Sequence, residues 1–325
     1  MKSTKTSWVG AATLVLLIAF TRVISAADAP MVIDESRQVS SNERIELEVM
    51  RGEVVIRTGT DNTFRVSGTL DELAEGFELR SDNGFTYFEV EMPRNVNNSG
   101  FRRSEESDLE IVVPAGSRIS FIGVNVEVDI DGVTGGTQIN TVNGDISASN
   151  LTERVELRTV NGNITARNIG GRIDLQTVNG EIRDSDSAGR AYYEAVNGEI
   201  DIDSAAGEVE VTVVNGSVRA QLRGTSDLSV NSVNGDIDVV LTDVTSPRIS
   251  GSTVSGEITL SLPADVDARF SLESHVGGNL VNHITDDEVV RSRYGPGRNL
   301  DFSTGQGAGH VDLSSVTGRL ELRTN

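Results

Sequence analysis

The chain has 325 residues, with 49 acidic and 28 Lys or Arg side chains, a net charge of −21 and no cysteine. The missing cysteine excludes disulfides, thiolate nucleophiles, cysteine-ligated zinc and the cysteine-linked lipid anchor of bacterial lipoproteins. The negative charge repels nucleic acid and anionic lipid, so we expect no nucleic-acid partner.

Residues 1–26 are predicted to be a secretory signal peptide. Lys2 and Lys5 form a positive start, residues 9–20 are an apolar run broken by two small or polar residues, and small residues occupy 25–27. This order is typical of export signals, and the run is shorter than the roughly 20 apolar residues of a spanning helix. We expect an exported protein, periplasmic or at the cell surface, with no transmembrane segment after cleavage. An uncleaved membrane anchor is the alternative.

Residues 27–118 are predicted to be an irregular β-structured cap. Apolar and polar residues alternate over 44–49 and 53–58, which is typical of strands with one buried face. A polar loop follows at 94–106, and an apolar strand runs from 108 to 114. An exposed sheet edge recruits other chains, so a capping segment of this kind is expected at the end of a repetitive fold.

Residues 119–262 contain a repeat of 18 residues. The tripeptide Val-Asn-Gly recurs with four intervals of 18 residues and one of 19, beginning at Val142, Val160, Val178, Val196, Val214 and Val233. Relative to the valine, the residues three and five before it are mostly apolar, as are those four and six after it. Each repeat therefore contains two short strands, one on each side of Asn-Gly.

This arrangement predicts an all-β, single-chain β-solenoid, of β-helix or β-roll type, with about 18 residues and two strands in each coil. Each strand would pair in parallel with its copy one coil away, at a spacing of about 4.8 Å. A single coil cannot bury its own apolar face, so neighbouring coils complete the core.

The Asn-Gly pairs are predicted to be structural turns. The pair favours turns that need a positive φ. It occurs at Asn143, Gly144, Asn161, Gly162, Asn179, Gly180, Asn197, Gly198, Asn215, Gly216, Asn234 and Gly235. The valine before each pair has the wrong parity for the buried set. Either a bulge tucks it inward or the valines stack outside, and the sequence leaves both open.

Residues 263–325 are predicted to form irregular C-terminal coils and a cap. The repeat spacing loosens there, and the apolar stretches 311–313 and 320–322 are the expected final strands. Handedness and oligomeric state do not follow from the pattern.

The sequence resembles a bacterial "putative adhesin" β-solenoid family, a domain of unknown function. The resemblance rests on Thr-Val-Asn-Gly-Asp-Ile at 141–146 and its copies, on the segment 108–116, and on 305–309 with Val316-Thr317-Gly318. It covers about residues 40–325 and implies adhesion at the cell envelope, without catalytic residues.

No catalytic residue and no cofactor is predicted. One candidate metal column follows the Asn-Gly pairs, at Asp145, Glu181, Glu199 and Asp236. Stacked carboxylates suit calcium, although Asn163 and Ser217 interrupt this column and calcium-binding rolls use a different nonapeptide. A solubilising acidic column is the simpler interpretation. The three histidines lack metal-ligand spacing.

The sequence thus predicts an exported, non-enzymatic, adhesin-like binding or scaffold protein of the bacterial cell envelope or surface. Its partner would be an unknown envelope protein or a surface glycan. One alternative is a carbohydrate-active β-helix enzyme, which would use acids brought close by stacking. A second alternative is a structural protein that self-associates through its end coils.

Overall fold

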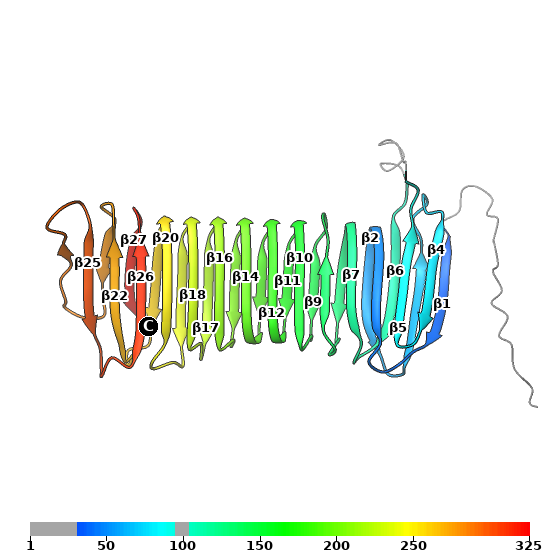
Figure 1. The fold of residues 1–325 in the computed structure, drawn as a ribbon, viewed down its shortest axis with the longest axis horizontal. Coiled ribbons are helices and arrows are strands. Elements are labelled where there is room, and N and C mark those ends of the chain that lie inside the picture. The colour runs from blue at the N-terminus through cyan, green and yellow to red at the C-terminus, as the bar shows by residue number, and fades with distance from the viewer. Residues whose placement is uncertain (1–30, 95–103) are drawn as a thin grey trace, which may run out of the picture.

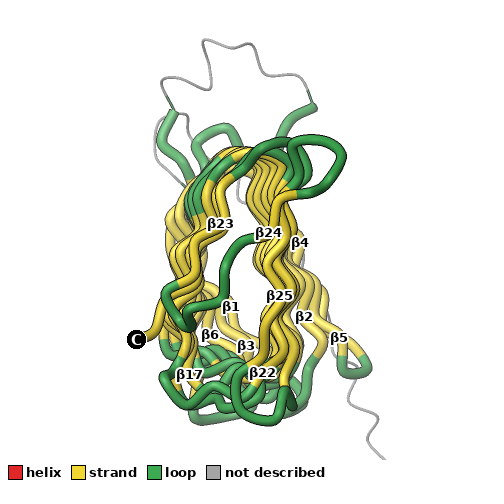
Figure 2. Tube along the Cα trace, turned by 90° about the vertical axis from the view of Figure 1, so that its left-hand side faces the viewer, coloured by secondary structure: helices red, strands yellow, loops and turns green. Residues whose placement is uncertain are grey.

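A computed structural model describes residues 31–94 and 104–325, and this part of the chain is all β, with no helix. The predicted signal peptide at 1–26 lies outside these residues. The predicted β-solenoid is confirmed: 27 strands stack along one axis in two facing layers (Figure 1). Seen along that axis, the two layers of strands are joined by turns at two opposite corners (Figure 2). None of the described residues forms a helix long and apolar enough to cross a membrane.

The regular coils each contribute one strand to each layer. The first face is built from the strands that precede the repeated corner: β8 (Thr137–Asn140), β10 (Arg154–Asn161), β12 (Gly170–Asn179), β14 (Ala188–Asn197), β16 (Glu208–Asn215), β18 (Asp227–Asn234) and β20 (Arg248–Ser255). The second face is built from those that follow it: β9 (Ile146–Ser149), β11 (Ile164–Arg167), β13 (Ile182–Ser185), β15 (Ile200–Ser204), β17 (Val218–Arg223), β19 (Ile237–Thr242) and β21 (Glu257–Leu262).

Equivalent residues of successive coils lie opposite each other, as the repeat predicts. Leu157 pairs with Leu175 in β10 and β12, and Ile164 pairs with Ile182 in β11 and β13, all in parallel register. These four side chains are fully buried between the two faces. Complete burial of one such side chain contributes about 1.5–3 kcal/mol, so the ladders of identical residues hold the coils together.

At the N-terminal end, two long strands follow both faces, namely β2 (Arg44–Gly59) and β7 (Arg118–Asp131). β2 lies between β7 and an outer layer made of β5 (Phe85–Glu91) and β6 (Ser107–Pro114). The end is closed by antiparallel strands, β4 (Gly76–Asp82) on β5, β3 (Thr63–Thr69) on β6, and β1 (Val32–Gln38) on β3.

At the C-terminal end, the last strands of the sequence are not the last in space. β26 (Gly309–Ser315) and β27 (Arg319–Thr324) pair directly with β20 and β21. β22 (Ala268–Ser274) and β23 (Asn279–Asn282) lie outside them. β25 (Arg298–Ser303) and β24 (Val290–Arg291) complete this end in antiparallel pairing. The chain therefore passes its own final coil and returns to insert it.

Candidate functional site

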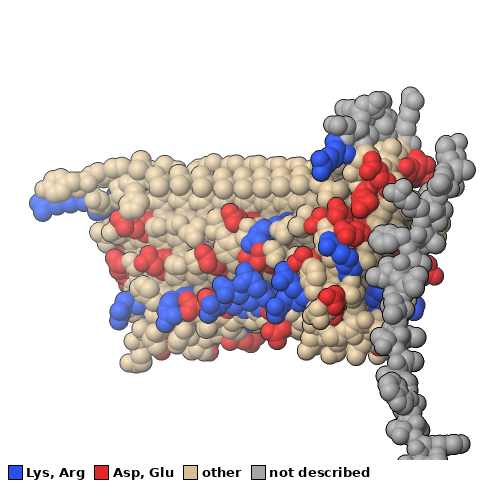
Figure 3. Space-filling view, turned by 45° about the vertical axis from the view of Figure 1, so that its right-hand side comes forward, with Lys and Arg blue, Asp and Glu red and all other residues tan. Residues whose placement is uncertain are grey.

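The repeated corner carries a row of exposed valines. Val142, Val160 and Val178 are 41%, 40% and 37% exposed, whereas the preceding Thr159 and Thr177 are buried. The Thr159 and Thr177 hydroxyls donate hydrogen bonds to glycine carbonyls of the previous coil. The valines thus stack outside, and this answers the question that parity leaves open. Figure 3 shows an uncharged band along this edge of the regular coils.

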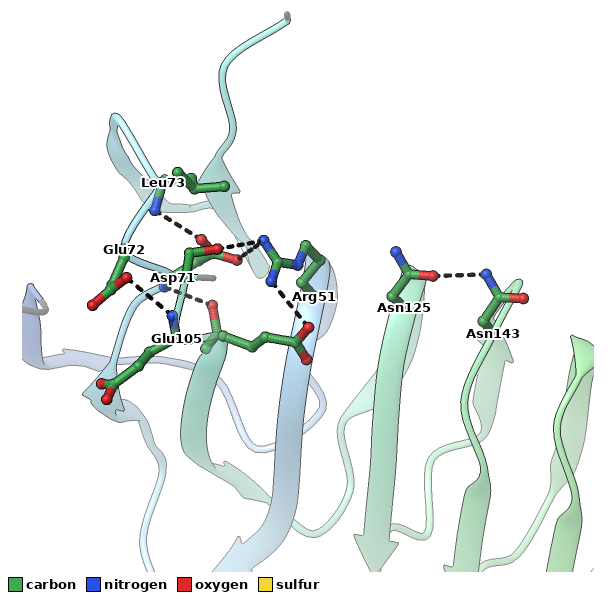
Figure 4. A network of polar contacts seen from close by, with 10 residues as sticks. Arg51, Asp71, Glu72, Leu73, Glu105, Asn125 and Asn143 are labelled. Atoms are coloured by element: carbon green, nitrogen blue, oxygen red, sulfur yellow. Dashed lines mark hydrogen bonds and ion pairs between the residues drawn. The ribbon is translucent and has the colours of Figure 1, made fainter. Parts of the chain in front are cut away.

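A row of asparagines runs beside the valines. Asn143 Nδ2 donates a hydrogen bond of 2.7 Å to Asn125 Oδ1, the pair drawn in Figure 4. The same bond recurs in every coil as far as Asn234, where it measures 3.2 Å. Each interior amide both donates and accepts along the axis, so the row stiffens the corner and fixes the height of each coil.

The expectation that a positive φ selects Asn-Gly is wrong for this corner. None of its asparagines has a positive φ, and among its glycines only Gly144 and Gly256 lie in the left-handed range. Glycine is needed because the coils approach closely. A Cβ added to Gly180 would lie 1.8 Å from the carbonyl oxygen of Gly162. The same short approach recurs at Gly198, at 1.7 Å from the Gly180 oxygen.

The left-handed residues lie at the opposite corner, where the sequence analysis did not look for them. Asn150, Asn168 and Asp186 have φ values of 55°, 53° and 58°. Asn168 Nδ2 donates a hydrogen bond of 2.7 Å to Asn150 Oδ1. Asn150 in turn donates to Asp131, and the bonds from Ser149 and Asn150 lower the pKa of the Asp131 carboxyl. The column eight residues after the valine was the available signal.

The candidate metal column is occupied by other interactions. Asp145 accepts the backbone N–H of Asn163 at 2.7 Å, and Asp236 accepts that of Glu257 at 3.0 Å. Glu181 and Glu199 form ion pairs with Arg183 and Arg219. In the described part of the chain, no group of three or more His, Asp or Glu residues is arranged to hold a metal ion. The paired acids that a glycosidase would need are thus engaged with arginines and backbone.

Two buried polar clusters interrupt the apolar core. Asp184 accepts hydrogen bonds of 2.5 Å from both Ser187 and Tyr193, and burial raises the pKa of its carboxyl. Near the N-terminal cap, Arg51 contacts Asp71 at 3.3 Å and Glu106 at 3.0 Å (Figure 4). Burial raises the pKa of Asp71 despite this arginine. Arg51 lies opposite Asn125, so this cluster closes the asparagine row.

The first face carries a column of arginines that sequence reasoning missed. It consists of Arg44, Arg118, Arg154, Arg172 and Arg190, all exposed. They belong to β2, β7, β10, β12 and β14, and each occupies the place six residues before the valine or its equivalent. An open groove of about 770 Å³ lies at the N-terminal half of this column. The column could have been found by reading the repeat for charge as well as for apolar residues.

Stacked coils with fixed external rows define this protein as a repetitive β-solenoid that displays side chains at regular heights. The model of the Toastrack DUF4097 family matches residues 42–286, and the chain belongs to this family.

Three crystal structures are similar to the chain. A putative adhesin from Parabacteroides distasonis ATCC 8503 is 14% identical over 71% of this chain and 97% of its own, with a TM-score of 0.47. A putative adhesin from Bacteroides fragilis NCTC 9343 is 13% identical over 90% and 98%, with a TM-score of 0.33. A putative cell adhesion protein from Clostridium sporogenes ATCC 15579 is 9% identical over 91% and 100%, with a TM-score of 0.21.

Proposed function

We propose that this protein is an exported, non-enzymatic binding or scaffold protein of the bacterial cell envelope or surface. The supporting observation is the regular display of one side chain at one height, coil after coil. The exposed valines and the hydrogen-bonded asparagines are the clearest example. A rigid, repeated surface fits a repeated partner, and an exposed apolar row marks an interaction site. A surface glycan is such a partner.

A binding experiment on the purified protein tests this proposal. The probes are a panel of neutral and acidic polysaccharides, together with whole bacterial cells from which the glycans have or have not been stripped. We expect saturable binding at micromolar protein concentration that disappears with the glycan. Binding to none of the polysaccharides and to neither cell preparation would contradict the proposal. Reducing ends or unsaturated products released from any bound polysaccharide would contradict its non-enzymatic part.

Self-association is a second candidate, supported by the C-terminal edge. β24 pairs with β25 only through Val290 and Arg291, so most of the outer edge of β25 has no strand partner within the described residues. Unpaired backbone groups on such an edge can recruit another chain. Light scattering tests this candidate: mass that rises with concentration supports it, and a constant monomer mass contradicts it.

A further inference from the structure

The arginine column is continuous in register along the first face. Arg44 pairs with Arg118, and Arg154 pairs with Arg172, which pairs in turn with Arg190. One rung between Arg118 and Arg154 carries Gly136 instead of an arginine. The six rungs span about 24 Å at a strand spacing of about 4.8 Å. Figure 3 shows basic side chains gathered in a band along the coils.

Like charges directly opposite each other on neighbouring strands are destabilising. This arrangement is conspicuous in a chain whose acidic residues outnumber its basic ones by 49 to 28. Further along the same column the charges are mixed: Arg190 faces Glu208 at 2.7 Å, and Arg248 faces Asp227 at 2.7 Å. The fold can therefore accommodate neutral pairs at these positions, and the N-terminal part of the column does not use them.

Two arginines of the column have no internal carboxylate. Arg44 pairs with Glu46 and Arg154 pairs with Glu156. By contrast, the side chains of Arg118 and Arg172 form no ion pair or hydrogen bond with any other described residue. Their guanidinium groups are exposed and retain all their donors. A guanidinium presents these donors as a planar fork that binds a carboxylate through two parallel hydrogen bonds.

The missing arginine creates the groove. Gly136 has a φ of 104°, a conformation that side-chain-bearing residues rarely adopt, so this rung remains without a side chain. Arg44, Arg118 and Arg154 line the resulting groove, together with the neutral polar residues Asn42, Thr134 and Gln138. Glu153 and Glu156 also line it, and Glu156 is already paired with Arg154 and Arg158.

We propose that this groove and the arginine column bind an extended, carboxylate-bearing polysaccharide that lies along the solenoid axis. This inference rests on the proposed function and names the class of glycan. Carboxylates occupy Arg118 and Arg172, and sugar hydroxyls contact Asn42, Thr134 and Gln138 in the groove. The repeat of the polymer then meets the repeat of the coils, so several modest contacts add along one chain.

The overall negative charge does not prevent this binding. At physiological ionic strength, charges more than about 8 Å apart are largely screened, so the nearest arginines dominate. The same column is less suited to nucleic acid. Single strands gain much of their affinity by stacking bases on aromatic side chains, and no aromatic residue is among the described residues that line the groove.

The test compares two double variants of the purified protein in calorimetric titrations with an oligogalacturonate. Arg118→Gln/Arg172→Gln removes the two unpaired arginines without breaking an ion pair. Arg65→Gln/Arg167→Gln is the matched control, because both residues are exposed, lie in β3 and β11 of the second face, and have no ion pair among the described residues. The two double variants carry the same net charge. Thermal unfolding of each checks that the fold is intact.

We expect the column variant to raise the Kd at least about tenfold, and the control variant to change it less than about twofold. Glu153→Gln should lower the Kd about twofold, because it removes an unpaired negative charge from the groove. Equal affinity of the two double variants would overturn the assigned site, even though the glycan binds and the proposed function stands. A preference for a neutral oligosaccharide of the same length, or for single-stranded DNA, would overturn the ligand class. Binding to none of the three probes would overturn this inference, while the polysaccharide panel and whole cells decide the broader function.

Discussion

The two corners of each coil solve the same problem by different means. At the repeated corner, glycines allow the coils to approach closely and asparagine amides link every coil to the next. At the opposite corner, residues with left-handed backbone turn the chain, and the links between coils are fewer. The 19-residue and 21-residue intervals in the sequence both place their extra residues at this opposite corner, before β18 and β20. The repeated corner thus sets the pitch, and the opposite corner absorbs variation.

The largest effect is expected from Gly180→Ala. The added Cβ would lie 1.8 Å from the Gly162 carbonyl oxygen, so backbone must move. We expect a loss of about 3 kcal/mol or more in the free energy of unfolding, measured by urea denaturation. Gly207→Ala at the opposite corner is the control, because its Cβ would meet only an ordinary contact at 4.0 Å. Equal losses in the two variants would mean that the corners do not differ in their packing.

A smaller effect is expected from breaking the asparagine row. Asn179→Ala removes two amide hydrogen bonds, one to Asn161 and one from Asn197. Asn234→Ala removes only one, because Ser255 occupies the next coil and Asn234 donates only to Asn215. We expect losses of about 2 and about 1 kcal/mol, respectively, in the free energy of unfolding. If the interior variant is no less stable than the terminal one, the row does not act as a continuous link.

The third prediction concerns Asp184, whose carboxyl contacts Ser187 in the opposite corner. Burial raises its folded-state pKa above the unfolded value of about 3.9. Its contribution to stability is therefore fully present below the unfolded pKa and is lost as the pH rises through the folded pKa. Asp184→Asn should flatten this decline, by at most about 1.4 kcal/mol per pH unit, in denaturation curves measured across that range. An unchanged pH dependence would show that Asp184 does not titrate between the two states.

Much of the fold could be predicted because each coil repeats the same constraints. The period, the two strands per coil and the buried isoleucine column follow from alternation around Val142 and its copies. The ends were less predictable, since nothing in the local pattern of 309–324 shows that these residues pair with β20 and β21. That choice depends on contacts between segments more than 50 residues apart in sequence.

The site was harder to predict than the fold. The sequence identified Asn143 and Gly144 as a turn, but it could not show that a carbonyl of the adjacent coil, and not a positive φ, excludes side chains from most of these glycine positions. The acids Asp145 and Glu181 drew attention as candidate ligands, although their partners lie in their own or the next coil. Arg118 and Arg172 went unnoticed, because the repeat was aligned for apolar residues and Arg118 precedes the first Val-Asn-Gly.

The stacking of the coils in register is the claim on which the rows, the groove and the proposed ligand all depend. The chain has no native cysteine, so two introduced cysteines can test it directly. Val160 and Val178 flank paired residues of β10 and β12, at a strand spacing that is compatible with a disulfide. We predict that Val160→Cys/Val178→Cys forms an intramolecular disulfide on mild oxidation, whereas Val160→Cys/Val196→Cys, two coils apart, does not. Cross-linking of the second pair but not the first would contradict the stacked solenoid.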